Sequence, residues 1–525
     1  METRTIPVLI VGGGPVGLSM ALALARQNIS SLLIERNSGT VLYPRTRGVS
    51  MRTMELFRQW GNADELLREE QPKEARRFIW AESLQGPEVT RTFIEDEHLQ
   101  AFCTAQSSFV TQNKVEESLY HTLMHCPNNS VEFSKELISF KQDENGVTAS
   151  VVNRVTNQPE LIQAKYLIAA DGAQSRIRQQ LGIEMDGSSD LGRYCSVYCE
   201  LDISKWTQHR PCFGYFFTDP HLAGRLLLSG DGPNRWIVFM QFKPTESQET
   251  FTDDYCMSEV KRVINAYHLP IHIMHKSFWT MGAQVAKEYR KDRVFLVGDA
   301  AHRIPPTGGL GMNTGIQDAH NLAWKLAFVL NYQVSDSLLD TYFEERSPVA
   351  LRNILWSIEN AKRYVKIAAA LKSGNLEEVT NEIQEQHKNL NFEGLDLGYI
   401  YHSKAVISEN DQTLSKSAST YVPTTLPGIR AFYIPGMEEA DLFEKEYVLL
   451  IGESGSAWQK ACIDLTLPIP LKVLRIPNNW PEKYEISPNG AVLVRPDGFI
   501  AWRSIALTVN PKGTLGQVFK QLFDF

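Results

Sequence analysis

The segment Val8-Leu-Ile-Val-Gly-Gly-Gly-Pro-Val-Gly-Leu18 contains the strongest fold signal of this chain. Its glycines Gly12, Gly14 and Gly17 have the GxGxxG spacing of the turn that joins a strand to a helix in dinucleotide-binding βαβ units. The first glycine permits the tight turn, the second lets the backbone approach a pyrophosphate, and the third lets the helix pack closely on the sheet. The N–H groups at the start of the helix then face the phosphate charge.

An acidic residue follows at the expected distance. Glu35 ends the next apolar run, 18 residues after Gly17, close to the offset of about 20 residues at which a carboxylate binds a ribose hydroxyl. A glycine-rich turn in some other α/β protein is the alternative. The order of strand, glycine turn, helix, strand and acid favours the dinucleotide site.

The composition of the 525 residues excludes several classes of protein. With 43% apolar and 22% charged residues it is typical of a globular protein, and the chain is too long for one hydrophobic core. The net charge of -8 argues against a nucleic-acid partner. No run approaches the ~20 apolar residues of a membrane span, so we expect no membrane insertion.

The seven cysteines are scattered without a CxxC pair, and no His/Cys cluster has the spacing of metal ligands. We therefore expect free thiols in a reducing compartment, a cytoplasmic location and no metal site.

Two more apolar runs end beside an acid and a glycine. Ile162–Ala170 is followed by Asp171, and Val294–Val297 leads into Asp299. Both runs are expected in the sheet of the first strand, which makes the nucleotide domain discontinuous. We expect this domain over residues 1–75, 110–184 and 286–345, a β-sheet domain over 76–109 and 185–285, a helical connection over 346–409, and a small α/β domain over 410–525. The expected fold class is mixed α/β and α+β.

The segment 293–313 is the most specific stretch of the chain. A strand delivers Asp299 at its C-terminal end, where ligands of open α/β sheets bind and where a carboxylate can accept hydrogen bonds from a polyol such as the ribityl chain of a flavin. Two prolines then stiffen the turn, and three glycines let the backbone approach a ligand. The N-terminus of the following helix suits negative charge on the ring of a reduced flavin. A glycine-rich helix cap is the alternative.

These motifs, in this order, resemble the class A flavoprotein aromatic hydroxylases, which share the p-hydroxybenzoate hydroxylase fold. The resemblance covers residues 5 to about 350, and it also includes the segments 44–55 and 171–178. The longer tail resembles, more weakly, the phenol and aromatic-polyketide hydroxylase branch. The resemblance implies a discontinuous Rossmann-like FAD domain, a β-sheet substrate domain and a C-terminal thioredoxin-like α/β domain. Because that tail contains only Cys462, we expect no disulfide exchange there.

The resemblance also implies the residues that contact the cofactor. Those expected to bind FAD are Gly12, Gly14, Pro15, Val16, Gly17, Glu35, Arg36, Arg45, Gln112, Asp171, Asp299, Pro306, Gly309, Gly311, Met312 and Asn313. Arg45, Pro305 and Gly308 are expected to position the flavin ring for catalysis. The alternatives are that Arg45 and Gln112 are surface groups and that Asp171 only caps a turn. No side chain is assigned as a catalytic acid or base.

In such a family, NADPH or NADH reduces the flavin, and O2 forms a flavin C4a-hydroperoxide that hydroxylates a phenolic or polycyclic aromatic substrate. A Baeyer–Villiger or antibiotic-modifying monooxygenase and a non-oxygenating FAD reductase are the alternatives. A homodimer is the assembly that the family suggests.

The substrate-binding residues are the least determined by the sequence. Tyr215, Phe239 and Trp279 are candidate pocket aromatics, although each could equally be a core residue. Gln284 stands where relatives often have a basic residue, which predicts recognition of a hydroxyl or carbonyl group rather than an anion.

Overall fold

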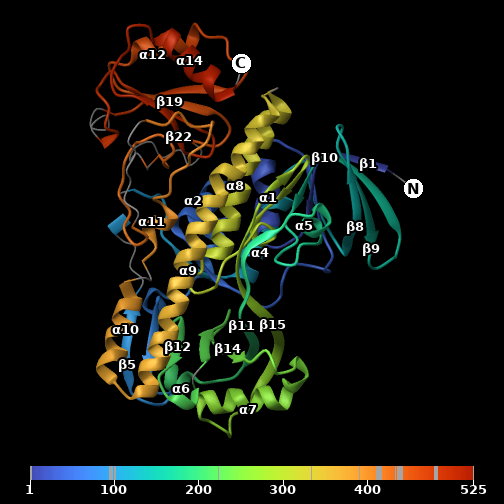
Figure 1. The fold of residues 1–525 in the computed structure, drawn as a ribbon, viewed down its shortest axis with the longest axis vertical. Coiled ribbons are helices and arrows are strands. Elements are labelled where there is room, and N and C mark those ends of the chain that lie inside the picture. The colour runs from blue at the N-terminus through green and yellow to red at the C-terminus, as the bar shows by residue number, and fades with distance from the viewer. Residues whose placement is uncertain are drawn as a thin grey trace.

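The computed structural model describes residues 3–93, 98–99, 102–222, 224–332, 334–388, 391–409, 417–431, 433, 442–477 and 483–523 (Figure 1). Three large sheets organise these residues. The first lies beside helices α1 (Pro15–Arg26) and α8 (Leu310–Asn331), the second lies at one end of the long helix α9 (Thr341–Ser373), and the third forms the C-terminal region (Figure 1).

The first sheet contains the parallel strands predicted around the glycine turn. Its order is β16 (Arg290–Lys291), β17 (Val294–Leu296), β10 (Pro159–Ala169), β1 (Thr3–Val11), β2 (Ser31–Glu35) and β7 (Asn129–Phe133), with β8 (Lys135–Gln142) and β9 (Val147–Asn153) extending from β10. The strand before Asp171 and the strand before Asp299 therefore share the sheet of the first strand, as predicted, and the Asp171 strand lies between the other two. Buried apolar side chains on β1 and β2 pack against α1 (Pro15–Arg26), whose alanines and leucines are buried.

The second sheet is antiparallel except where β12 meets β4. Its order is β18 (His302–Arg303), β15 (His272–Ala286), β11 (Met185–Glu200), β14 (Arg235–Phe242), β13 (Arg225–Ser229), β12 (Gly214–Phe217), β4 (Arg77–Ala81) and β5 (Glu88–Phe93). Helix α7 (Asp253–Ile264) covers one face, which we call the outer face, and shares a hydrophobic core with it. The opposite, inner face is directed toward the first sheet and α9.

Helices join the three sheets. The largest are α8 (Leu310–Asn331), α9 (Thr341–Ser373) and α10 (Leu376–Lys388), and α9 runs from the C-terminal region toward the second sheet, where its last turns pack on that sheet (Figure 1). The others are α2 (Met51–Trp60), α3 (Ala63–Arg68), α4 (Gln112–Met124), α5 (Arg176–Leu181), α6 (Ser204–Thr207) and α11 (Glu393–Asp396). A short two-stranded sheet pairs β3 (Arg47–Val49) with β6 (Ser108–Thr111). No helix in the described part of the chain is long and apolar enough to cross a membrane.

The C-terminal sheet has the order β20 (Leu471–Arg475), β19 (Tyr447–Ile451), β21 (Ala491–Val494) and β22 (Ile500–Ser504), flanked by α12 (Ser456–Ile463) and α14 (Pro511–Phe523). Its hydrophobic core is not self-contained, because Trp324 and Phe328 of α8 belong to the same cluster as Tyr447 and Phe519. The C-terminal region is therefore packed directly on the helix that follows Asp299.

Candidate cofactor and substrate site

The C-terminal ends of β1, β10 and β17 meet at one edge of the first sheet. The N–H of Ala170 donates to the carbonyl of Val11 (2.9 Å), and the N–H of Val297 donates to that of Ala169 (3.0 Å). The turns that follow these strands carry the glycine motif and the two predicted acids, which are distant in sequence and neighbours here.

The glycine turn is shaped so that side chains are excluded from two of its positions. Gly12 has φ +114°, and a Cβ there would overlap the carbonyl of Ala170, while a Cβ on Gly17 would overlap the carbonyl of Gly12. At Gly14, by contrast, no atom lies within 4 Å of the position of a Cβ. The turn therefore leaves an open approach to the N-terminus of α1, which is the surface that a pyrophosphate needs.

Glu35 lies beside this turn at the end of β2. Its carboxylate accepts hydrogen bonds from the N–H of Gly13 (2.7 Å) and from the N–H of Asn37 (2.8 Å). These contacts fix the carboxylate next to the glycine turn, where the sequence placed the ribose-binding acid. Arg36, the next residue, is exposed.

The two other acids, Asp171 and Asp299, are each partly enclosed by protein. Burial raises the pKa of Asp171, whose Oδ2 accepts a hydrogen bond from the N–H of Ile177 (3.3 Å), while its Oδ1 is buried without a hydrogen-bond partner among the described residues. Burial also raises the pKa of Asp299, although this residue is exposed to solvent. A carboxyl group that is enclosed by protein except on one side can be exposed to solvent there and still have a pKa raised by the surrounding protein. Both acids are thus available to a polar ligand at this edge.

The start of α8 provides a second helix N-terminus near these turns. Gly309 precedes the helix with φ +67°, and the position of a Cβ on Gly311 is free of atoms within 4 Å. Pro305 and Met312 are buried, whereas Pro306 is exposed. The open side of this first turn is where the backbone can approach a flat ring.

Two predicted residues in this segment have structural contacts that the sequence did not reveal. A Cβ on Gly308 would overlap the ring of Trp356 in α9, so helix packing requires this glycine. The Asn313 side chain is buried, accepts a hydrogen bond from the N–H of Ser50 (2.9 Å) and donates to the carbonyl of Gly48 (3.2 Å). It therefore joins α8 to the segment that carries Arg45.

Arg45 and Gln112, both expected to bind FAD, lie near each other. The N–H of Gln112 donates to the carbonyl of Thr46 (2.9 Å), and its side chain donates to Glu116 (2.8 Å). The charge of Arg45 also acts on the Glu116 carboxyl. Arg45 itself is exposed.

The sequence prediction missed Arg47. This residue is buried, its Nη1 donates to Ser229 (3.0 Å) in the second sheet, and its guanidinium lies 5.0 Å from the ring centroid of Phe213. Burial lowers the pKa of Arg47 to about 10. Arg45 and Arg47 are equivalent in an Arg-Thr-Arg sequence, and only the tertiary structure shows which of them is buried between the two sheets.

These features fit FAD. The glycine turn and the two helix N-termini suit a pyrophosphate and an electron-rich ring edge, and three carboxylates suit sugar and polyol hydroxyls. The residues that would hold the cofactor are those around Gly14, Glu35, Asp171, Asp299 and Gly311.

The inner face of the second sheet is aromatic where β11, β14 and β15 pair. Tyr194 stacks on Trp279 with ring centroids 4.5 Å apart, and Phe239 meets Trp279 edge-on at 6.1 Å. The indole N–H donates to Ser196 (2.8 Å). Tyr194, Phe239 and Trp279 are half-buried, so each retains accessible ring surface.

Two contacts establish where this inner face points. Tyr43 of the first domain stacks on His275 of β15 with centroids 4.6 Å apart. Trp80 and Phe216, also on the inner face, pack against Ile367 of α9. The aromatic face is therefore directed toward the cofactor-binding half of the molecule.

The other two substrate candidates, Tyr215 and Gln284, lie outside this group of rings, and for Tyr215 the structure agrees with the core-residue alternative. Tyr215 alternates with the inner-face residue Phe216, belongs to the outer-face core, and donates its hydroxyl to the carbonyl of Arg210 (2.7 Å). Gln284 lies at an even position of β15, opposite in direction to Trp279, and accepts a hydrogen bond from Arg303 (2.9 Å).

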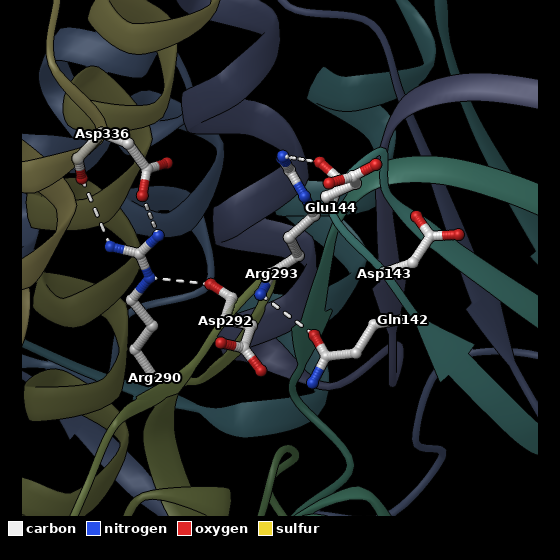
Figure 2. A pocket seen from close by; sticks show the side chains of 7 residues that line it. All are labelled: Gln142, Asp143, Glu144, Arg290, Asp292, Arg293 and Asp336. Atoms are coloured by element: carbon white, nitrogen blue, oxygen red, sulfur yellow. Dashed lines mark hydrogen bonds and ion pairs between the residues drawn. The ribbon is translucent and has the colours of Figure 1, made fainter.

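A hollow of about 470 Å³ lies elsewhere, at the start of β17 rather than at its end. Its lining residues are Gln142, Asp143, Glu144, Arg290, Asp292, Arg293 and Asp336. Figure 2 shows Arg290 turned toward Asp336 and Arg293 turned toward Glu144, so both cations already have partners. This hollow is separate from the candidate site.

Comparison with known proteins agrees with the site. A family model described as "FAD binding domain" matches residues 5–357, and one described as "Aromatic-ring hydroxylase, C-terminal" matches residues 435–524. The chain is 32% identical to aklavinone 12-hydroxylase RdmE of Streptomyces purpurascens over 100% of both chains. It is also 32% identical to 4-methyl-5-nitrocatechol 5-monooxygenase of Burkholderia sp, covering 97% of this chain and 96% of that protein.

A solved structure gives the same result. The flavin-dependent monooxygenase PieE, in complex with FAD and substrate, superposes with a TM-score of 0.88 at 30% identity and 99% coverage of each chain. These findings confirm the predicted resemblance, the fold class and the cofactor FAD. The chain belongs to the FAD-dependent aromatic-ring hydroxylases and is a flavoprotein monooxygenase.

Proposed function

We propose that this protein hydroxylates a phenolic or polycyclic aromatic ring that rests on the inner face of the second sheet, using O2 and either NADPH or NADH. The observation that carries the proposal is the half-buried group of Tyr194, Phe239 and Trp279, directed toward the FAD-binding edge of the first sheet. Stacked and edge-on rings are the surface that an aromatic ligand prefers. Both an aklavinone hydroxylase and a nitrocatechol monooxygenase are relatives, which supports either ring size.

The chain's own groups hold and orient the reactants. Gly14 and the N-terminus of α1 receive the pyrophosphate, Glu35 the ribose, and Asp299 the ribityl chain. Arg45 and Pro305 position the flavin ring. FAD held by these residues would accept electrons from the nicotinamide cofactor and activate O2, of which one oxygen atom goes to the substrate and the other to water. The aromatic face holds the substrate ring and excludes water from it. We propose no side chain as a catalytic acid or base.

The test is oxidation of NADPH and NADH in the presence of a panel of phenols and polyketide quinones, carried out under 18O2. We expect one substrate class to stimulate cofactor oxidation and to acquire one labelled hydroxyl group. A label within a lactone or ester would instead identify a Baeyer–Villiger reaction. Stimulated oxidation that never transfers a label to product would identify a reductase and refute the proposal.

We further propose that the protein acts in the cytoplasm as a homodimer. Seven scattered thiols without a disulfide support a reducing compartment. Sedimentation of the holoenzyme at several concentrations tests the dimer, and a monomer across the range would contradict it.

A further inference from the structure

A buried polar network connects α8, α9 and the turn between β21 and β22. The side chains of Asp318 and Lys325 in α8, Glu345 and Arg346 in α9, and Arg495 beyond β21 are fully or almost fully buried. Charged residues are rarely buried unless they are paired. The network therefore imposes a geometry on the elements it joins.

One end of the network holds the turn that presents Asp299. Oδ2 of Asp318 accepts a hydrogen bond from the N–H of Gly298 (3.2 Å) and lies 2.6 Å from Nε2 of His302. Gly298 directly precedes Asp299 and has φ +58°. Asp318 thus braces the turn from both sides, on residues 298 and 302.

The same carboxylate is oriented from α9. Nε of Arg346 donates to Oδ1 of Asp318 (2.7 Å), and Nη2 of Arg346 donates to the carbonyl of Thr314 (3.0 Å). Its remaining Nη1 donates to the hydroxyl of Tyr401 (3.1 Å). Arg346 therefore links Tyr401 to Asp318 by hydrogen bonds to both side chains.

The other end belongs to the C-terminal domain. Arg495 donates from both Nη atoms to Glu345, at 2.6 and 2.9 Å, and its guanidinium lies 5.3 Å from the ring centroid of Tyr401. Glu345 also accepts from Lys325 of α8 (2.8 Å). Arg495 consequently contacts both Glu345, which binds Lys325 of α8, and Tyr401, which binds Arg346.

The charges in this network balance. The carboxylates of Asp318, Glu345 and Asp497 face the cations of Lys325, Arg346 and Arg495. Removal of one member leaves its buried partner uncompensated, which is far more costly than loss of a surface ion pair.

We propose that Arg495 and Tyr401 are positioning residues of the FAD site. Through Glu345, Arg346 and Asp318 they hold the Gly298–Asp299 turn and the start of α8, so the C-terminal domain contributes to FAD affinity without contacting the cofactor. This role goes beyond the proposed reaction and does not depend on the identity of the substrate.

The experiment measures FAD affinity by flavin fluorescence quenching on full-length apoprotein. Arg495→Gln is expected to weaken FAD binding roughly tenfold, and Tyr401→Phe, which keeps the ring and loses one hydrogen bond, roughly threefold. The matched control is Arg503→Gln. Arg503 lies in the same domain and also pairs with two carboxylates, Glu409 and Glu485, but not with α8 or α9. It should lower the Tm and leave FAD affinity within about twofold of wild type.

A second measurement separates positioning from general stability. Amide hydrogen exchange in residues 298–303 of apoprotein should accelerate in Arg495→Gln and Tyr401→Phe, and should not change in Arg503→Gln. If Arg495→Gln does not fold, the mild Tyr401→Phe variant decides. Wild-type FAD affinity and wild-type exchange in Tyr401→Phe would overturn the proposal, even if its Tm were lowered.

Discussion

The proposed site combines two surfaces, one formed mainly by backbone atoms and the other mainly by side chains. The edge of the first sheet offers backbone: open glycines, helix N–H groups and acids that are themselves held by backbone N–H groups. The inner face of the second sheet offers side chains, chiefly the rings of Tyr194, Phe239 and Trp279. Backbone geometry allows no substitute for a missing glycine, whereas a ring can be replaced by another apolar group at moderate cost. The cofactor side should therefore be intolerant of mutation and the substrate side adjustable.

The sharpest form of this contrast is a pair of glycine substitutions. Gly17→Ala should unfold the domain or abolish FAD binding, because its Cβ would overlap the Gly12 carbonyl inside a packed strand–helix junction. Gly14→Ala should leave the apoprotein as stable as wild type, since the position of its Cβ is free of atoms, and should weaken FAD binding by roughly a hundredfold by blocking the pyrophosphate. Thermal unfolding and FAD titration of both apoproteins are the measurements. Equal stability of the two apoprotein variants would contradict the expected difference between the two glycines.

A second prediction concerns the raised pKa of Asp299. A carboxyl group whose pKa is higher in the folded protein than in the unfolded chain binds protons more tightly when folded. The stability that this carboxyl group contributes when protonated is therefore lost as the pH rises through its raised pKa in the folded protein. At neutral pH the ionised group lowers the free energy of unfolding of the apoprotein. Asp299→Asn should raise the Tm of apoprotein at neutral pH and reduce FAD affinity by at least about tenfold.

The pH dependence supplies the control for Asp299→Asn. The difference in Tm between variant and wild type should shrink as the pH falls below the raised pKa of Asp299, where the wild-type carboxyl is protonated. A constant difference across pH would show that the substitution acts through packing instead.

The backbone surface of the first sheet was easier to predict from the sequence than the side-chain surface of the second sheet. Gly12, Glu35 and Asp299 could be proposed as cofactor-binding residues from sequence because each stands in a short motif at a fixed distance from a strand end. The direction of Tyr215 depends on strand alternation, for which a single residue of register decides the face. Gly308 was expected to position the flavin ring, and the structure also places the ring of Trp356, 48 residues further along the chain, against it. The sequence contains no local signal for that contact.

The aromatic face should respond more mildly. Phe239→Leu removes a ring from the proposed substrate surface, and an aromatic pair between that ring and the substrate is worth about 0.5–1.5 kcal/mol. KM for the aromatic substrate should therefore rise about threefold to tenfold with FAD affinity unchanged. Phe217→Leu is the matched control, because Phe217 belongs to the outer-face core and its loss should lower Tm instead. A larger effect on KM at Phe217 than at Phe239 would show that the inner face is not the substrate surface.

The smallest effect is expected at Gln284. Its amide oxygen accepts a hydrogen bond from Arg303, whose guanidinium also lies against Gly282 and donates to the carbonyl of Thr280 (2.9 Å). Because the Gln284 amide oxygen is hydrogen-bonded to Arg303 and the side chain points away from Trp279, we expect it to contribute little to the binding of an aromatic ligand. Gln284→Leu should therefore leave KM within about twofold of wild type, while it frees one donor of a half-buried arginine and lowers Tm slightly. A tenfold rise in KM, measured with the same substrate as for Phe239→Leu, would place the substrate across the edge of β15 and extend the binding surface beyond the aromatic face.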